Sequence, residues 1–180
     1  MAPEKLQVAA TGLGRIGKRY AIDFLNRTSR AELPGLNTVF IGTAASVHAD
    51  EAIQAMQKNL HVLCEKPLST SISILLKCHQ VVEEAKKHPH LKVMCGFPRR
   101  FDESYHDARN KAEQGLIGRP SIIRSQTCDK RDPSVFFIAY DAWSGGVFVD
   151  VSVHDIDLTL WFFADDIQPK SVSAHSIRAV

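Results

Sequence analysis

The sequence predicts an α/β fold: a shortened, doubly wound parallel sheet, followed by the start of an α+β open-sheet domain. Short apolar runs alternate with helix-patterned stretches four times between residues 6 and 97. Strands that alternate with helices in this way are typical of a parallel sheet. The pattern changes after Gly118-Arg119-Pro120, where residues 121–127 alternate like a strand with one wet face. We therefore expect one domain over residues 1–118 and a second, partial domain over residues 119–180.

The composition is that of an ordinary globular protein. Of 180 residues, 44% are hydrophobic and 23% charged, and the net charge is +2. This balance offers no basic patch, so we expect no nucleic-acid partner. No apolar stretch reaches membrane-spanning length and no apolar run follows the first residues, so we expect no membrane partner and a cytoplasmic location. The four cysteines lack C-x-x-C spacing, which fits a reducing compartment.

The first strand, within residues 6–10, leads into a glycine-rich turn and then a helical pattern to about residue 26. The turn has the G-x-G-x-x-G spacing, in which glycines allow close backbone approach and the helix N-terminus offers free N–H groups to a pyrophosphate. The alternative is a glycine-rich strand–helix turn without a ligand. The spacing predicts a Rossmann-like domain whose cofactor contacts come from Gly12, Leu13, Gly14, Arg15, Ile16 and Gly17.

The second strand that a dinucleotide fold requires is interrupted in this sequence. Such a strand ends in an acidic residue about 20 positions past the glycines, and this residue binds the ribose. Here Ala31-Glu32-Leu33 begins like a strand, but Pro34-Gly35 interrupts it at once. The sequence therefore does not distinguish NAD from NADP.

The next elements are strands at residues 38–43, 61–65 and 92–97, with helices at residues 47–58 and 71–87. Lys66 ends the middle strand, inside Glu65-Lys66-Pro67. A buried lysine is costly to desolvate, and ligands of open α/β sheets bind at the carboxyl ends of strands, so Lys66 is predicted to lie in the site. His48 falls in the first turn of a helix and is expected to face the cofactor; the alternative is a solvated histidine at a helix end.

Two arginines directly follow the last of these strands. Arg99 and Arg100 stand at a carboxyl end, where they would suit an anionic or polyhydroxylated ligand. The alternative is a structural ion pair with Asp102.

Residues 147–162 are predicted to form one helix after Gly145-Gly146. In such a helix Asp150 and His154 lie one turn apart on the same face, as a proton-transfer pair requires. The alternatives are a solvated surface pair and, more weakly, a metal site that includes Asp157; we expect no metal.

With these motifs in order, the chain resembles the Gfo/Idh/MocA oxidoreductase family, in particular its inositol 2-dehydrogenase-like branch. The resemblance implies an NAD(P)-dependent dehydrogenase that acts on a CH–OH group of a sugar, polyol or cyclitol. The family is usually homo-oligomeric. The matching pieces are the glycine loop, Thr43 to His48, Glu65-Lys66-Pro67, Gly96 to Asp102, and Gly145-Gly146 through Asp150 and His154.

The resemblance also implies roles. Lys66 is expected to contact both the nicotinamide and the reacting oxygen, His154 to act as general base, and Asp150 to orient the histidine or the substrate. Arg99 is expected at the substrate. The remaining cofactor contacts implied are Thr43, Ala44, His48 and Glu65.

The chain departs from the family pattern in two places. About one βαβ unit, roughly thirty residues, is absent between the first helix and the strand at residues 38–43. The sequence also stops after the first strands of the second domain, whose sheet carries the family's interface. The chain thus resembles a member with an internal deletion and a truncated C-terminus. The alternative function is therefore an inactive family remnant with weak or no nucleotide binding.

Overall fold

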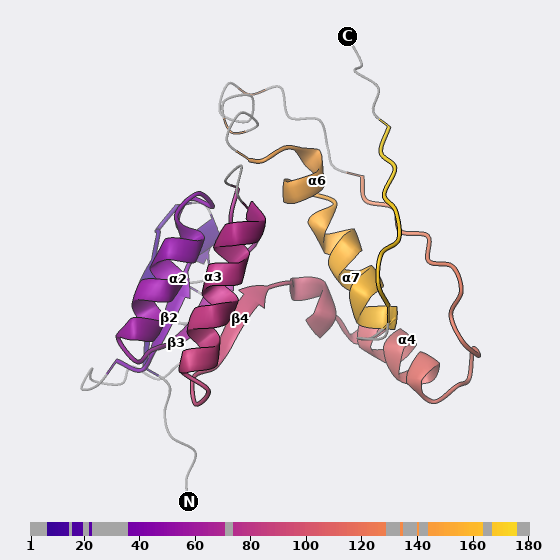
Figure 1. The fold of residues 1–180 in the computed structure, drawn as a ribbon, viewed down its shortest axis with the longest axis horizontal. Helices are drawn as coiled ribbons and strands as arrows, with labels where there is room; N and C mark the ends of the chain where they lie inside the picture. Colours follow the sequence, from indigo (N-terminus) through magenta and orange to yellow (C-terminus); the bar gives the residue numbers. More distant parts are fainter. Residues whose placement is uncertain are drawn as a thin grey trace, which may run out of the picture.

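The computed structural model describes residues 7–14, 16–19, 22, 36–70, 74–128, 134, 140, 144–163 and 167–175. Figure 1 shows two bodies: a parallel sheet covered by α2 and α3, and a second body that contains α4, α6 and α7. The segment from β4 through the 3-10 helix η1 connects them (Figure 1). Arg15 and the interrupted strand around Glu32 lie outside the described residues.

The sheet has four parallel strands in the order β1-β2-β3-β4: Val8–Thr11, Thr38–Ile41, His61–Glu65 and Val93–Gly96. The register places Thr11 beside Ile41, Ile41 beside Cys64 and Cys64 beside Cys95. All carboxyl ends therefore reach the same edge. The glycine loop, the turn after β2 and Lys66 all follow that edge, so the predicted α/β fold class is confirmed.

The core lies between the sheet and helices α2 (His48–Gln57) and α3 (Ile74–Lys87). It consists of alternate residues of the inner strands and small residues of α2, because a strand points every second side chain to the same face. Its buried members are Val39, Ile41, Ala49, Ala52, Ala55, Met56, Val62, Cys64, Val81 and Leu91.

Helix α3 contributes less to the core than its apolar spacing predicts. Val81 is buried, but Leu75 is 79% exposed and Val82 is also exposed. The helix turns only one side to α2 and the sheet, and no described element covers the other. The apolar residues of α3 therefore belong only in part to the core.

The second body begins at η1 (Pro98–Phe101) and α4 (Glu103–Glu113). Asp102 caps α4, accepting hydrogen bonds from the backbone N–H groups of Ser104 and Tyr105 at 2.9 and 3.4 Å. This carboxylate therefore satisfies a helix end, and it is not the partner of the preceding arginines.

The predicted helix over residues 147–162 is two helices, α6 (Val147–Asp150) and α7 (Val153–Phe163). At the break the Ser152 N–H donates to the Val147 carbonyl at 3.0 Å, five residues back, and the His154 N–H donates to the Val151 carbonyl at 3.3 Å, three residues back. This change of hydrogen-bond spacing interrupts the i to i−4 series. The prediction of a continuous helix was wrong.

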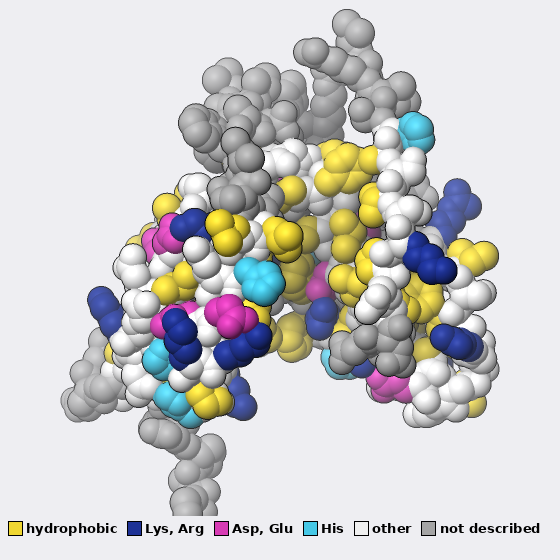
Figure 2. All heavy atoms as spheres, viewed as in Figure 1, with side chains coloured by type: hydrophobic (Ala, Val, Ile, Leu, Met, Phe, Trp, Pro, Cys, Tyr) yellow, Lys and Arg dark blue, Asp and Glu magenta, His cyan; other side chains and the backbone are white. Residues whose placement is uncertain are grey.

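Residues 121–128 and 167–175 form no strand among the described residues, so the strand predicted at residues 121–127 is not formed. Ile122 and Val172 are exposed in these segments. Hydrophobic side chains also lie between the two bodies and over the second (Figure 2). None of the helices described has the length and apolar character to cross a membrane.

Candidate active site

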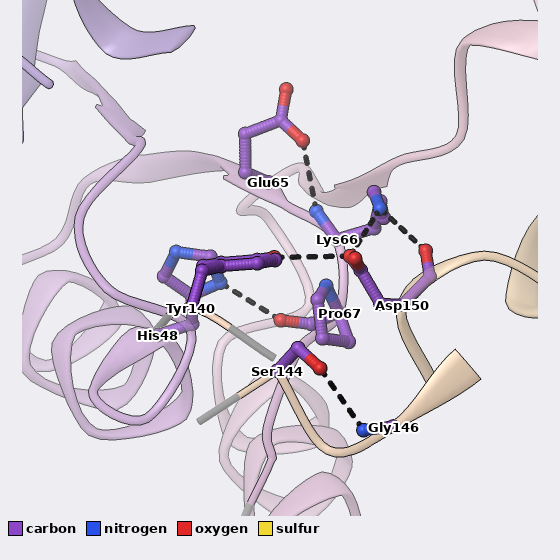
Figure 3. Close-up of polar contacts among 8 residues, drawn as sticks. All are labelled: His48, Glu65, Lys66, Pro67, Tyr140, Ser144, Gly146 and Asp150. Carbon is purple, nitrogen blue, oxygen red and sulfur yellow. Dashed lines mark hydrogen bonds and ion pairs between the residues drawn. The ribbon is translucent and has the colours of Figure 1, made fainter. Parts of the chain in front are cut away.

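Lys66 lies at the end of β3, where it meets a residue 84 positions later in the chain. Its Nζ donates to the backbone carbonyl of Asp150 at 2.6 Å and to Oδ1 of the same residue at 3.0 Å (Figure 3). Both side chains are largely shielded from solvent, with exposures of 21% and 18%. The contact joins the two bodies at the predicted edge of the sheet, as a strand-end site requires.

A pair of glycines brings Asp150 to this position. Gly145 and Gly146 have φ angles of +83° and +84°, in the left-handed region that favours glycine. A Cβ at Gly145 would lie 3.0 Å from Cγ1 of Val149, so the turn is also tight. The Gly-Gly sequence thus allows α6 to begin directly beside the Lys66-Pro67 turn (Figure 3).

Tyr140 adds a donor that sequence reasoning missed. Its hydroxyl donates to Oδ1 of Asp150 at 3.1 Å (Figure 3). No motif or periodicity marks this tyrosine in the sequence, so no sequence signal pointed to it.

His154 is the second residue of α7, and the charge of Lys66 acts on it. Its ring packs edge-to-face against Phe97, with centroids 6.1 Å apart. Its Nδ1 is buried and has no hydrogen-bond partner among the described residues. A buried, unpartnered ring nitrogen is unusual in a folded protein and marks a candidate functional group.

The surroundings of His154 favour its neutral form. Burial lowers the pKa of His154, and the positive charges of Lys66 and Arg99 lower it further; Asp155 and Asp157 act in the opposite direction without reversing the shift. A neutral imidazole can accept a proton at neutral pH, which is what a general base does.

Asp150 and His154 form no hydrogen bond with each other in the described part of the chain. The carboxylate of Asp150 is instead bound by Lys66 and Tyr140. The structure therefore brings Lys66 and Asp150 into direct contact and places His154 beside them, with a different pairing from the one predicted.

The two arginines after β4 both bind carboxylates of α7. Arg99 donates from Nη1 to Oδ1 of Asp155 at 2.7 Å and from Nη2 to Oγ1 of Thr127 at 2.8 Å. Arg100 binds Asp157 in bidentate fashion, at 2.9 and 2.6 Å. The alternative of a structural arginine–aspartate pair is therefore correct for both arginines, but the partners are Asp155 and Asp157 and not Asp102. Contact of Arg99 with a substrate stays a prediction.

The Asp155 carboxylate also accepts hydrogen bonds from two hydroxyl groups. Ser125 and Thr127 donate to it in addition to Arg99. Burial acts to raise the pKa of Asp155, but these hydrogen bonds together hold it below its ordinary value. The carboxylate is therefore ionised in the neutral range and ties α7 to residues 125–127.

The glycine loop is a tight turn with open space at its second glycine. Gly12 has φ +77°, and a Cβ there would lie 2.5 Å from the backbone of Gly42; a Cβ at Gly17 would lie 1.7 Å from the Gly12 carbonyl oxygen. A Cβ at Gly14 would meet nothing within 4 Å. The first and third glycines thus close the turn, whereas the second leaves open space beside the start of a helix, where the Lys18 N–H donates to the Gly14 carbonyl at 2.9 Å. Leu13 and Ile16 are exposed on this loop.

His48, which was expected to face the cofactor, is buried and bonded within the protein. It is only 2% exposed, and its Nδ1 lies 2.8 Å from the Pro67 carbonyl oxygen (Figure 3). Its Nε2 lies 3.2 Å from the Thr43 carbonyl oxygen. The imidazole therefore bridges the turn after β2 and the turn after β3. The alternative of a solvated helix-end histidine was wrong, and neither ring nitrogen is open to a ligand.

The other expected cofactor residues also make contacts within the protein. The Thr43 hydroxyl donates to Oε2 of Glu51 at 2.9 Å, and the Ala44 carbonyl accepts from the Val47 N–H at 3.0 Å. Oε2 of Glu65 accepts from the Lys66 N–H at 3.1 Å. These contacts shape the turns that line the carboxyl edge, and cofactor contact by these residues stays a prediction.

A hollow on the described surface lies away from these residues. It has a volume of about 670 Å³ between α6, α7 and the extended segments at residues 125–127 and 167–169. Asp155 lines it, but Lys66, Asp150 and His154 do not. Among the described residues no group of three or more His, Cys, Asp or Glu side chains is placed to hold a metal.

Two family models match the chain. Residues 33–97 match the model described as "Oxidoreductase family, NAD-binding Rossmann fold", and residues 105–180 match the "GFO/IDH/MocA C-terminal domain". The chain belongs to the Gfo/Idh/MocA family. Both parts of the family architecture are therefore present, in the order that the motifs predicted.

Individual Gfo/Idh/MocA proteins support this assignment. The scyllo-inositol 2-dehydrogenase (NAD(+)) of Bacillus subtilis is 36% identical over 80% of this chain and 40% of its own length. The myo-inositol 2-dehydrogenase of Thermotoga maritima is 29% identical over 76% of this chain and 39% of its own. The chain thus spans about two fifths of the curated relatives it matches.

A solved structure gives the same result for the fold. The scyllo-inositol dehydrogenase from Lactobacillus casei, determined with bound cofactor NAD(H) and scyllo-inositol, superposes with a TM-score of 0.73 at 26% identity. The match covers 88% of this chain and 56% of that one. Within this Gfo/Idh/MocA architecture, the contact of Lys66 with Asp150 is the meeting point of the two matched domains.

Proposed function

We propose that this chain forms the nicotinamide side of an NAD(P)-dependent oxidoreductase site, which transfers hydride between the cofactor and a hydroxyl-bearing carbon of a polyol or cyclitol. The observation that carries the proposal is the meeting of Lys66 with Asp150, 3.0 Å apart, beside a His154 whose pKa is lowered. A neutral imidazole can accept the hydroxyl proton and a fixed cation can stabilise the negative charge that develops on the oxygen, which suits the oxidation of an alcohol. The names of the relatives support a cyclitol as substrate.

Each residue has a distinct task in this proposal. Bound NAD(P) would supply the hydride acceptor, and the open space at Gly14 fits its pyrophosphate. His154 accepts the proton of the substrate hydroxyl. The ammonium of Lys66 stabilises the negative charge that develops on that oxygen, and Asp150 keeps the ammonium in place.

The first test is a titration of the purified chain with NADH and NADPH, followed by nicotinamide fluorescence. A screen of polyols and cyclitols then identifies a substrate. His154→Ala is expected to lower kcat by about 10²–10⁴-fold and to leave the affinity for NADH unchanged, because the histidine handles only the substrate proton. His79→Ala, which removes an exposed histidine from α3, is the matched control. Equal losses of turnover and NADH affinity in His154→Ala would contradict the assigned role.

A second candidate is a non-catalytic protein that keeps the site residues but binds nucleotide weakly or not at all. One observation favours it. The strand order of a complete dinucleotide fold is 3-2-1-4-5-6, whereas β1 lies at one edge of the sheet formed by the described residues. The side of the sheet that holds the adenosine is therefore not represented among them. If a folded preparation binds neither NADH nor NADPH, this second candidate replaces the first.

A further inference from the structure

Tyr140 and Lys66 bind the same carboxylate oxygen. The Tyr140 hydroxyl donates to Oδ1 of Asp150 at 3.1 Å, and Lys66 Nζ donates to this oxygen at 3.0 Å (Figure 3). Lys66 Nζ also donates to the backbone carbonyl of Asp150 at 2.6 Å. Two donors from different parts of the chain thus converge on Oδ1.

The other carboxylate oxygen of Asp150, Oδ2, receives no hydrogen bond from a described residue. An ionised carboxylate accepts hydrogen bonds at both oxygens. The terminal torsion of aspartate is broad, so the side chain alone does not determine which oxygen points where. The two donors on Oδ1 therefore decide the orientation and leave Oδ2 without a donor among the described residues.

The chemistry of a phenol suits this task. A tyrosine hydroxyl is neutral, so it holds the carboxylate without cancelling its charge, as a second cation would. The ring of Tyr140 is 38% exposed, which places it at the rim of the site and not in the core. A hydroxyl in this position orients Asp150 and leaves the access of a ligand to Oδ2 open.

We propose that Tyr140 is a positioning residue that keeps Oδ2 of Asp150 available for a second hydroxyl of the substrate. The inference rests on the proposed dehydrogenase function. Asp150 contacts Lys66 directly, so the two side chains reach neighbouring positions on a bound substrate. If the reacting oxygen contacts Lys66, the hydroxyl that reaches Oδ2 is therefore the one on the carbon next to the carbon that is oxidised. The site therefore selects polyols with a free hydroxyl next to the carbinol that is oxidised.

The test compares a cyclitol substrate with its deoxy analogue, which lacks the hydroxyl next to the reacting carbon. We expect wild-type kcat/KM to favour the intact cyclitol by about 100-fold, because the analogue leaves a buried acceptor unpaired. Tyr140→Phe is expected to lower kcat/KM for the intact cyclitol about tenfold and for the analogue less than about twofold. Tyr105→Phe, on a tyrosine of similar exposure (36%) in α4, is the matched control and is expected to change neither value.

The outcomes separate this inference from the proposed function. The role is supported if the wild type is active and Tyr140→Phe lowers the ratio of kcat/KM for the intact cyclitol to kcat/KM for the deoxy analogue. The melting temperature of the variant is expected to be unchanged. Equal losses on both substrates would indicate a merely structural residue and would overturn the inference, as would a variant that matches wild type. A wild type that binds NADH but turns over no polyol would overturn the proposed function, and the inference with it.

Discussion

Replacing Gly14 by alanine tests whether the glycine loop is shaped for a ligand or only for the fold. A Cβ at this position would meet nothing within 4 Å, and Gly14 has no φ in the left-handed region. Gly14→Ala is therefore expected to change the free energy of unfolding by less than about 1 kcal/mol, with a slight gain from reduced freedom of the unfolded chain. A large effect of Gly14→Ala on nucleotide affinity would therefore come from contact of the new methyl group with a molecule bound at the loop, and not from a change in the fold.

The expected effect on nucleotide affinity is much larger. A methyl group on the open side of the loop separates a pyrophosphate from the backbone donors at the helix start, and hydrogen bonds to charged groups contribute about 1.5–3 kcal/mol each. Loss of one such bond corresponds to an increase in the Kd for NADH of about 10- to 150-fold. The assay is the fluorescence titration, with urea unfolding measured on the same preparation.

Two further glycine variants serve as references. Gly17→Ala places a Cβ 1.7 Å from the Gly12 carbonyl oxygen, so it is expected to disrupt the loop and lower both stability and affinity. Gly115→Ala changes an open glycine with φ +74° in another part of the chain, and it is expected to leave the Kd unchanged. If Gly14→Ala binds NADH as tightly as wild type, the loop does not hold a pyrophosphate and the reasoning is refuted.

Three other predictions concern protonation, ion pairing and thiols. Because His154 must be neutral to accept a proton and its pKa is lowered, kcat/KM is expected to fall as pH decreases with a midpoint below 6.5, the ordinary value for histidine; a midpoint above 6.5 would contradict this. Arg100→Met leaves the buried Asp157 unpaired and is expected to lower the free energy of unfolding by about 2–4 kcal/mol in urea, whereas the double variant with Asp157→Leu recovers at least half of the loss. Burial raises the pKa of the Cys95 thiol to about 12, so a thiol reagent is expected to modify the exposed Cys128 first and Cys95 only on unfolding, as timed labelling with mass spectrometry shows.

The strands and helices of the first body could be predicted from the sequence because each follows a simple apolar pattern. The predicted strand at residues 61–65 coincides with β3, His61–Glu65, and the predicted helix at residues 71–87 contains α3, Ile74–Lys87. Lys66 was located by the same reasoning, since a charged residue at the end of a buried strand stands out. The domain division at residue 118 stays a prediction; α4 contacts α7, because Arg109 lies over the Trp161 ring at 4.6 Å.

The second body was harder to predict because its contacts join residues far apart in the chain. The spacing of Asp150 and His154 is correct for one helical turn, but it does not reveal the break after Asp150. The partner of Asp150 is 84 residues away, and the partner of Arg99 is 56 residues away. Spacing within one element cannot show such pairs, and Tyr140 was missed for the same reason.

The adjacent arginines of η1 determine the rotation of α7 about its own axis. Arg99 binds Asp155 and Arg100 binds Asp157. Two residues apart on a helix, these carboxylates point in directions that differ by roughly 200°, because an α-helix has about 3.6 residues per turn. Since β4 leads directly into η1, the helix cannot roll in either direction without breaking one pair. The direction in which His154 points is therefore set from the end of a strand in the other body.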